Sequence, residues 1–385
     1  MNSQGSSATS NSGFSRERWH AATWQYVSRV LIILLSLGAG LVNATARSHT
    51  SAYVTNVSGT VSVIDTTTNT VFATIPVGIF PSGVAITPDG TRVYVTNIFN
   101  SISVIDAATN MVVLTIPSGQ FPTGIAITPN GTRAYVVNQF VTNQGNNTVS
   151  VIDTTTNAIV ATISVGLGPS EIAITPDGTR AYVPDQQDSI ISVIDTATNT
   201  VVTTVPVRGT AGIAITPDGT QAYVTSPGAG TVSVIDIATN TVLATISLGT
   251  NQNPFGVAIT PDGTRAYVTI SFPNNFVSVI DTATNTVVAT IPVGVAPNGV
   301  AITPDGSRAY VTNDDSDSVS VIDTTTSTVV ATIPVGVGPV AVAITPMSPT
   351  PTDKEQCKDH GYSKFGPPAG PFKNQGQCVS DVEHH

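Results

Sequence analysis

Between Gly299 and Val335 the chain reads Gly-Val-Ala-Ile-Thr-Pro-Asp-Gly-Ser-Arg-Ala-Tyr-Val-Thr-Asn313, then Asp-Asp-Ser-Asp317, then Ser-Val-Ser-Val-Ile-Asp-Thr-Thr-Thr-Ser-Thr-Val-Val-Ala-Thr-Ile-Pro-Val335. The second half of this unit also occurs at the start of the array, and nearly the same unit recurs 41 to 47 residues apart. Its tyrosine falls at Tyr53, Tyr94, Tyr135, Tyr182, Tyr223, Tyr267 and Tyr310. A period in the low forties made only of short strands predicts a β-propeller, with one four-stranded sheet in each repeat.

Each unit divides into four strands, which we name a to d from the central axis outward. The array opens with b, c and d strands at Ala52–Asn56, Val61–Asp65 and Val71–Val77, with no a strand before them. It ends with an a strand at Val340–Pro346 and no b strand after it. The phase of the repeat therefore predicts an all-β protein with seven antiparallel blades over residues 51–346. One blade would be built from both ends of the array, which leaves no open terminal blade.

The composition indicates strands, tight turns and an acidic surface. Charged residues make up only 10% of the chain, and Val, Ile, Thr, Gly and Pro fill the repeats. The array holds six arginines, no lysine, seventeen aspartates and one glutamate, a net charge of −12. Because that sign repels phosphate backbones and anionic lipids, we expect no nucleic-acid partner.

The N-terminal segment has the pattern of a secretory signal. Arg16, Arg18 and Arg29 precede the apolar run Val30–Val42, and Ala44-Thr-Ala46 follows. We interpret residues 1–46 as a signal peptide that is cleaved after Ala46. An uncleaved anchor is the alternative, but this run is shorter than the roughly 20 residues that span a bilayer. The predicted location is secreted, periplasmic or at the cell surface, with no membrane span after cleavage.

After the array come a Pro/Thr linker at residues 347–352 and a tail at residues 353–385. The tail contains both cysteines of the chain, Cys357 and Cys378. In an exported protein an even cysteine pair suggests a disulfide, which would stabilise this short segment by roughly 3 kcal/mol. Three histidines, His360, His384 and His385, also lie there, and we expect them to be solvated.

The repeats resemble those of YVTN-type β-propeller proteins. The resemblance rests on Tyr53-Val-Thr-Asn56, Tyr94-Val-Thr-Asn97 and Tyr310-Val-Thr-Asn313, with Ser-Val-Ile-Asp and Ile-Thr-Pro-Asp-Gly in phase, and it covers all seven units. Such repeats occur in bacterial secreted proteins and archaeal surface-layer proteins, whose members are mostly not enzymes. The resemblance therefore implies a seven-bladed fold and a role outside catalysis.

Seven aspartates end the c strands where each enters a Thr/Asn-rich turn. They are Asp65, Asp106, Asp153, Asp195, Asp236, Asp281 and Asp323. An aspartate there accepts hydrogen bonds from turn N–H groups and threonine hydroxyls, so we interpret all seven as structural. Antiparallel pairing of strands b and c predicts which residue lies opposite each aspartate. The predicted pairs are Arg92–Asp106, Arg133–Asp153, Arg180–Asp195, Arg265–Asp281 and Arg308–Asp323, with Gln221 opposite Asp236 and Ser51 opposite Asp65.

Several residue types are missing between Ser51 and Pro346, namely His, Cys, Lys and Trp. Without His or Cys the usual ligand sets for zinc, copper or haem cannot be assembled. Ser-His-Asp, Cys-His and Schiff-base mechanisms are excluded for the same reason. We therefore predict no catalytic residue and no cofactor, and favour a protein that is not an enzyme. The alternative is a lactonase-like or quinoprotein-associated propeller that uses the channel mouth.

The connections between strands fall into a constant and a variable class. The a–b turns (Thr-Pro-Asp-Gly-Thr) and c–d turns (Asp-Thr-x-Thr-Asn) barely change, whereas the b–c and d–a loops differ from repeat to repeat. Antiparallel connections put the two variable classes on one rim, which we name the variable rim, and the others on the constant rim. Because loops carry binding while the scaffold repeats, the variable rim is the candidate binding surface. Neutral drift in the loops is the alternative.

Five residues of these loops are candidate ligand contacts: Glu171, Arg208, Asp185, Asp188 and Phe255. Glu171 is the only glutamate of the array, and Arg208 is its only arginine outside the turn before strand b. Both fall in consecutive d–a loops, near the predicted channel mouth. They could equally form an exposed pair worth less than about 1 kcal/mol.

One acidic loop is a weak candidate for calcium. Asp314, Asp315 and Asp317 could offer carboxylate oxygens to Ca²⁺, although such a loop is more often solvated. Taken with the other features, the sequence predicts an exported, monomeric binding or scaffold module whose variable rim contacts a protein or a glycan.

Overall fold

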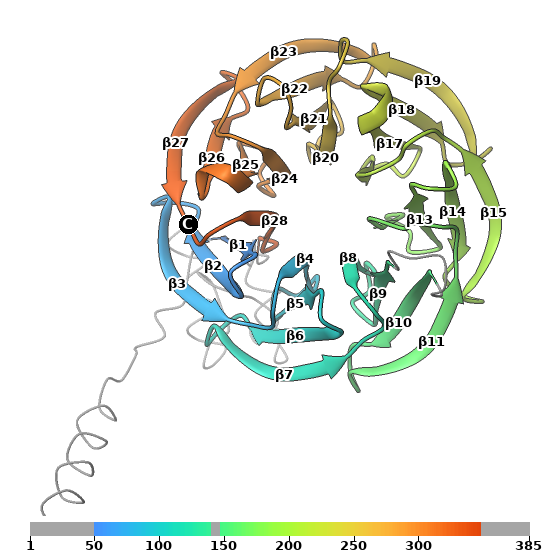
Figure 1. The fold of residues 1–385 in the computed structure, drawn as a ribbon, viewed down its shortest axis with the longest axis vertical. Helices are drawn as coiled ribbons and strands as arrows, with labels where there is room; N and C mark the ends of the chain where they lie inside the picture. Colours follow the sequence, from blue (N-terminus) through green and yellow to red (C-terminus); the bar gives the residue numbers. More distant parts are fainter. Residues whose placement is uncertain (1–49, 140–146, 348–385) are drawn as a thin grey trace, which may run out of the picture. The chain divides into compact units, whose positions relative to one another are not determined.

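The computed structural model describes residues 50–139 and 147–347, all within the compact unit Ala46–His385. These residues form seven four-stranded antiparallel sheets, arranged as blades around a common axis (Figure 1). The predicted all-β, seven-bladed propeller is therefore confirmed for this part of the chain. Blade 1 consists of β28, β1, β2 and β3, and blades 2 to 7 follow in chain order from β4–β7 to β24–β27.

Within each blade the strands run from a, nearest the axis, to d, on the outside (Figure 1). The a strands are β28 (Pro339–Ile344), β4 (Pro81–Ile86), β8 (Pro122–Ile127), β12 (Ala173–Ile174), β16 (Ile213–Ile215), β20 (Pro254–Ile259) and β24 (Pro297–Ile302). The b strands are β1 (Ser51–Asn56), β5 (Arg92–Asn97), β9 (Arg133–Asn138), β13 (Arg180–Asp185), β17 (Gln221–Ser226), β21 (Arg265–Ile270) and β25 (Arg308–Asn313). The c strands are β2 (Thr60–Asp65), β6 (Ser101–Asp106), β10 (Thr148–Asp153), β14 (Ile190–Asp195), β18 (Thr231–Asp236), β22 (Phe276–Asp281) and β26 (Ser318–Asp323). The d strands are β3 (Thr70–Pro76), β7 (Met111–Pro117), β11 (Ala158–Ser164), β15 (Thr200–Pro206), β19 (Thr241–Ser247), β23 (Thr286–Pro292) and β27 (Thr328–Pro334). Two 3₁₀ turns, η1 (Pro227–Ala229) and η2 (Asp314–Ser316), lie in b–c loops.

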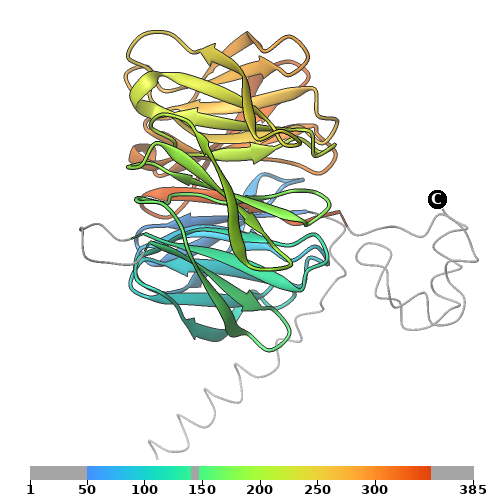
Figure 2. The same ribbon diagram turned by 90° about the vertical axis from the view of Figure 1, so that its right-hand side faces the viewer.

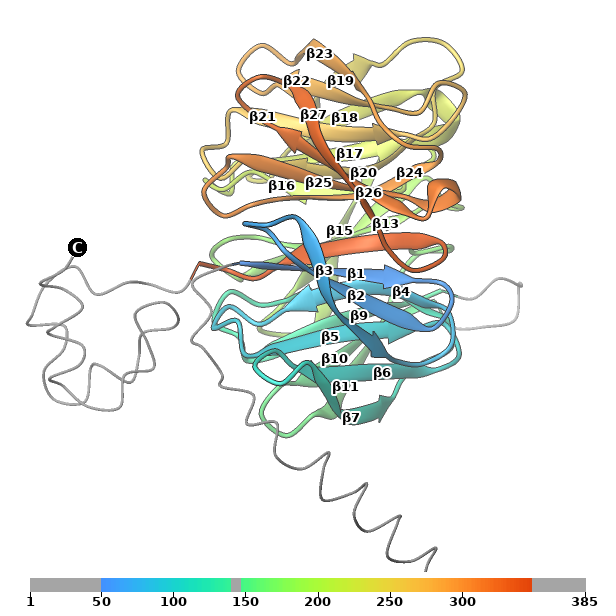
Figure 3. The same cartoon turned by 90° about the vertical axis from the view of Figure 1, so that its left-hand side faces the viewer.

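Blade 1 combines strands from both ends of the array. Its order is β28-β1-β2-β3, and Figure 3 shows β28 beside β1. The Thr345 amide donates to the Ser51 carbonyl at 2.9 Å, and the Ser51 amide donates to the Thr345 hydroxyl at 2.8 Å across a separation of 294 residues. The a strand of blade 1 thus comes from the end of the array and its other strands from the beginning.

The apolar core lies between neighbouring blades. One cluster joins Tyr94, Ile102 and Val104 of blade 2 to Ile125 and Ile152 of blade 3, and the other clusters repeat this arrangement around the ring. All seven repeated tyrosines are at most 1% exposed. Each blade has apolar residues on both faces because both faces are covered by a neighbour.

The tyrosine hydroxyls connect successive blades. In six blades the hydroxyl donates to an asparagine side chain in the c–d turn of the next blade, at 2.6–2.9 Å. These pairs are Tyr53–Asn110, Tyr94–Asn157, Tyr135–Asn199, Tyr182–Asn240, Tyr223–Asn285 and Tyr310–Asn69. Each asparagine has φ of 53–56°, a left-handed conformation that asparagine tolerates better than most residues. Tyr267 of blade 6 is the exception, because the c–d turn of blade 7 has Ser327 in place of the asparagine.

The strand register agrees with the prediction in all seven blades. Each c-strand aspartate lies opposite the expected residue, including Gln221 opposite Asp236 and Ser51 opposite Asp65. The connections gather at two opposite sides of the blades (Figure 2). Hydrogen bonds join c–d turns to a–b turns, as from Thr196 to Gly178, and d–a loops to b–c loops, as from Ile98 to Phe80. The variable and constant rims are therefore separate surfaces.

Several predictions lie outside the described residues. They are the signal peptide at 1–46, most of the linker, the Cys357–Cys378 disulfide and the three tail histidines, and they stay predictions. Within residues 50–139 and 147–347, the structure contains no helix with the length and apolar character needed to cross a membrane.

Candidate functional site on the variable rim

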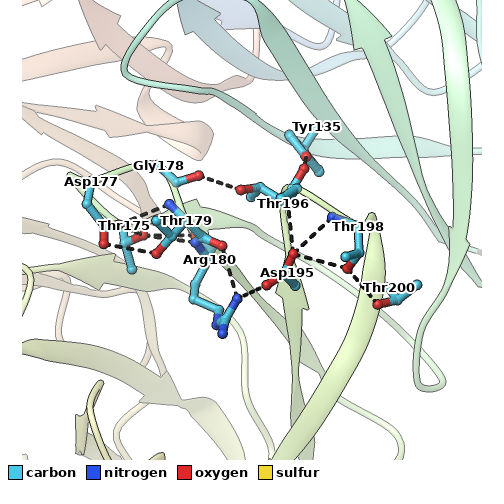
Figure 4. A network of polar contacts seen from close by, with 11 residues as sticks. Tyr135, Thr175, Asp177, Gly178, Thr179, Arg180, Asp195, Thr196, Thr198 and Thr200 are labelled. Atoms are coloured by element: carbon cyan, nitrogen blue, oxygen red, sulfur yellow. Dashed lines mark hydrogen bonds and ion pairs between the residues drawn. The ribbon is translucent and has the colours of Figure 1, made fainter.

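The polar groups of the constant rim bind one another. In blade 4, Asp195 Oδ1 accepts hydrogen bonds from the amide and hydroxyl of Thr198, at 2.9 and 3.0 Å (Figure 4). Asp177 accepts hydrogen bonds from Thr175 and Thr179 in the adjacent a–b turn. All seven c-strand aspartates accept bonds of this kind from their turns, as the sequence predicts.

Arginine completes this network in three blades. Ion pairs join Arg92 to Asp106, Arg133 to Asp153 and Arg180 to Asp195. The hydrogen bond from the Thr198 amide lowers the pKa of Asp195 most, and the hydrogen bond from the Arg180 side chain lowers it further. Because groups of their own turns already donate hydrogen bonds to these carboxylates, the aspartates have little remaining capacity to bind a ligand.

The variable rim instead exposes apolar side chains at the tips of its d–a loops. Ile79, Leu167, Val295 and Val337 occupy equivalent positions before the next a strand, and each is 46–63% exposed. Arg208 takes this position between blades 4 and 5, and it is exposed as well. The candidate residues chosen from the sequence were mostly polar, so these four apolar loop tips were missed. An apolar residue between Gly and Pro in several repeats is the signal that could have revealed it.

An open pocket of about 530 Å³ lies on the variable rim of blade 1. Its walls are the b–c loop Val57–Gly59, the d–a loop Val77–Phe80, and Val337 from the preceding d–a loop. Phe99, which is 57% exposed, extends the pocket edge, since its ring centre lies 6.0 Å from that of Phe80. We name Ile79, Phe80, Phe99 and Val337 the blade 1 apolar patch.

A second pocket, of about 510 Å³, lies on the same rim between blades 5 and 6. It is lined by the loop Pro227–Gly230, the loop Thr250–Asn253 and Phe272, which is 64% exposed. Its lining is more polar because Asn251, Gln252 and Asn253 contribute amide groups.

Phe80 has a backbone conformation that suits glycine. Its φ is 50°, and the equivalent residues of other d–a loops include Gly168, Gly209 and Gly338, with φ of 60–70°. Phe121 has the same conformation in the next loop, with φ of 49°. A left-handed conformation costs a residue with a side chain roughly 1–2 kcal/mol. The exposed Phe80 side chain is thus kept at a position where glycine would fit better.

The acidic loop lies directly beside the pocket. Asp314 and Asp315 are in η2 and Asp317 ends it, and Asp317 Oδ1 accepts the Gly338 amide at 2.9 Å, next to pocket residue Val337. Burial and the charges of Asp315 and Asp317 raise the pKa of Asp314. Within the described ranges no ion pair reaches these carboxylates, and no group of acids or other ligands there is arranged to hold a metal. Calcium binding stays a hypothesis.

Glu171 lies shortly before the a strand β12, at a position where five other repeats have glycine and blade 1 has Ala341. A side chain at the equivalent Gly83 would collide with the Thr123 carbonyl of the next blade, and Gly212 and Gly256 are similarly confined. Beside Glu171 the a strands β12 and β16 contain only two and three residues, and Gly124 of the preceding blade lies against Glu171. Desolvation raises the pKa of Glu171, and the Ile172 amide opposes this effect. Glu171 is nevertheless exposed to water. We expect this contact with water to limit the rise in its pKa.

Missing threonines explain the short strands. In five blades a b-strand threonine, such as Thr96, donates to the a strand of the next blade at 2.6–2.8 Å. Blades 3 and 4 have Val137 and Pro184 at this position, and β12 and β16 are the a strands of the blades that follow them. Around Glu171 the inner segments are joined instead through Ser170, whose carbonyl accepts from Thr123 at 3.0 Å and whose hydroxyl donates to the Ala211 carbonyl at 2.8 Å.

Two other predicted site residues lie in strands rather than in loops, and a third, Asp188, lies in its predicted loop. Asp185 is the last residue of β13 rather than part of a loop, and it is 0% exposed. Phe255 is the second residue of β20 and is 39% exposed. Asp188 is exposed in the loop, but its Oδ2 accepts the Leu167 amide at 2.7 Å. Among the described residues no ion pair connects Glu171 with Arg208.

Asp185 occupies a site that four other blades fill with asparagine. Asn56, Asn97, Asn138 and Asn313 donate to a c-strand serine at 2.9–3.1 Å. In blade 4 the direction is reversed, and the Ser192 hydroxyl donates to Asp185 Oδ2 at 2.6 Å. Burial raises the pKa of Asp185 to about 6, although the bond from Ser192 opposes this. A ligand could reach this carboxylate only if the loops moved.

Comparison with known proteins supports the fold. Residues 41–209, less than half of the chain, match the Choice-of-anchor I domain, and no curated protein matches the sequence. Hydrazine synthase of Kuenenia stuttgartiensis is 26% identical with a TM-score of 0.62, over 68% of this chain and 88% of that one. A functionally unknown protein from Desulfotomaculum acetoxidans is 18% identical with a TM-score of 0.66, over 77% and 99%. The dihydro-heme d1 dehydrogenase NirN is 17% identical with a TM-score of 0.59, over 77% and 76%.

These relatives share the propeller fold, and they include enzymes. The last two likenesses are below 25% identity, so they bear on the fold alone. The resemblance to YVTN-type repeats stays a prediction.

Proposed function

We propose that the protein is an exported recognition module that is not an enzyme and binds a partner protein through its variable rim. The contrast between the two rims carries this proposal. Turn amides and hydroxyls occupy the aspartates of the constant rim, whereas the variable rim has both pockets and the exposed d–a loop tips. Exposed apolar side chains grouped around a pocket are typical of interaction sites.

Two further observations bear on export and on the enzyme alternative. The basic, apolar and small-residue pattern before residue 47 supports export, as does similarity to a domain whose name refers to an anchor. Similarity to hydrazine synthase, an enzyme, favours the alternative of a propeller with a role in catalysis. Against that alternative, the array has no His or Cys with which to hold a metal or haem.

Site-specific photo-crosslinking in exported fractions of the source organism tests the proposal. A crosslinker would replace Gln187, in the b–c loop of blade 4, or Ala197, in the c–d turn of the same blade. Both residues are exposed. A protein crosslinked from position 187 and not from position 197 is the expected result. Equal crosslinking from both positions, or capture of glycan alone, would contradict the proposal.

A further inference from the structure

The blade 1 apolar patch and the neighbouring acidic loop form one continuous surface. Ile79, Phe80, Phe99 and Val337 are 46–63% exposed. On the chain, Val337 adjoins Gly338, whose amide donates to Asp317. A side chain on Gly338 would meet both Val57 of the pocket wall and Asp314 Oδ1, the latter at 3.0 Å. Apolar and anionic groups are thus within one side-chain length of each other.

We propose that this surface binds an extended segment of a partner protein that inserts a bulky aliphatic or aromatic side chain into the pocket and places a lysine or arginine against Asp314 and Asp315. This inference rests on the proposed function and specifies its site and ligand class. A pocket of about 530 Å³ can receive one such side chain. The nearby carboxylates supply the complementary charge.

Charge complementarity favours a cationic partner over the other occupants. The charges on the described loops of the variable rim are the exposed Asp188, Asp315, Asp317 and Glu171, the half-buried Asp314 and a single cation, Arg208. A second copy of this chain would present the same negative rim, so a symmetric contact would oppose like charges. An anionic membrane is repelled for the same reason. A glycan would need more polar side chains than Ser58, the one polar side chain of the pocket lining.

The backbone at Phe80 provides independent support. Four equivalent positions show that glycine or alanine suffices for the turn, since Gly168, Gly209, Gly338 and Ala296 adopt the same left-handed conformation. Phenylalanine at this point is 46% exposed, so only part of its ring is buried to offset the strain. Strained residues of this kind concentrate at binding sites, where the side chain has a use in contact with a partner.

The test is selection from a random peptide library displayed on phage, with the folded propeller as bait. We expect enriched peptides to share a Leu, Ile or Phe with a Lys or Arg within three positions. The double variant Phe80→Gly, Phe99→Ser should weaken binding of such a synthetic peptide by about tenfold or more, as for a hot-spot residue. Asp315→Asn should weaken it several-fold and reduce its dependence on salt.

Two matched variants control this experiment. Phe272→Ser removes an exposed phenylalanine from the other pocket, and Glu171→Gln removes a carboxylate of the same rim. Both should leave peptide affinity within about twofold, and a cooperative melting transition at or near the wild-type temperature would show that each variant is folded. The inference is overturned by the absence of enriched peptides, by acidic or purely polar consensus sequences, or by binding that ignores Phe80 and Phe99. A crosslink from position 187 that survives the double variant would leave the proposed function intact while rejecting this site.

Discussion

The Tyr310 hydroxyl donates a 2.6 Å hydrogen bond to Asn69 Oδ1, which joins blade 7 to blade 1. The same hydroxyl lies 3.2 Å from the Thr66 carbonyl, and the Tyr310 ring is 0% exposed. The bond therefore connects the two ends of the array at the constant rim. Blade 1 is also joined internally by the β28–β1 ladder, so two different interactions hold the junction.

Replacement of Tyr310 by Phe should lower the free energy of unfolding by about 1 kcal/mol, as loss of a buried hydrogen bond does. Tyr267→Phe is the matched control, because Ser327 stands where the other turns have asparagine. Urea denaturation of both variants provides the measurement. Equal losses of stability in the two variants would mean that the hydrogen bond to asparagine does not contribute to the free energy of unfolding.

Removal of β28 tests the junction more severely. Truncation after Gly338 deletes the a strand of blade 1 and exposes the β1 edge, so we expect the whole propeller to unfold at a lower temperature. Truncation after Met347 removes the tail, including Cys357 and Cys378, but keeps β28. That second variant should melt like the full chain. An unchanged melting temperature after loss of β28 would contradict the idea that both chain ends stabilise one fold.

Asp185→Asn should stabilise the protein above about pH 6 and have little effect below about pH 4. The folded-state pKa, about 6, lies above the ordinary aspartate value, so folding favours the protonated carboxyl. Stability from this group is complete at low pH and is lost as pH rises through the folded-state pKa. A shift of about two pH units corresponds to roughly 3 kcal/mol at neutral pH, as an upper estimate.

Denaturation curves of wild type and Asp185→Asn between acid and neutral pH measure this difference directly. The other carboxylates titrate equally in both proteins and cancel in the comparison. Asn97→Asp places the carboxyl in the equivalent site of blade 2 and should show the opposite effect, with stability lost as pH rises. A difference between wild type and Asp185→Asn that does not change with pH would show that Asp185 is not buried as an acid.

Much of the scaffold could be predicted because the repeat encodes it several times. The spacing of tyrosines and c-strand aspartates predicted the blades, and antiparallel pairing then predicted every b–c register. The rim assignment followed from the same connections. Each of these features depends on short-range patterns and strand direction, which a sequence displays openly.

The candidate site was harder to predict because it depends on small shifts in position. Asp185 looked like a loop residue, yet β13 extends through it and buries it where other blades have asparagine. Glu171 was recognised as unusual, but its setting depends on neighbouring b strands, where Val137 and Pro184 replace the threonine of the other repeats. The apolar loop tips were overlooked because exposure of Ile79 or Val337 follows from loop direction in space, which sequence spacing does not determine.

The last prediction concerns the strain at Phe80. Phe80→Gly should leave the free energy of unfolding unchanged or raise it by up to about 1 kcal/mol, since relief of the left-handed conformation outweighs the greater entropy of unfolded glycine. Phe80→Ala is the matched control: it also removes the ring but keeps a side chain at φ 50°, so it should gain less. Thermal and urea unfolding of both variants provide the comparison. A loss above about 1 kcal/mol in Phe80→Gly would show that the ring stabilises the fold through its contact with Phe99. A gain in stability together with weaker peptide binding would show that this phenylalanine is kept for contact with a partner and not for the fold.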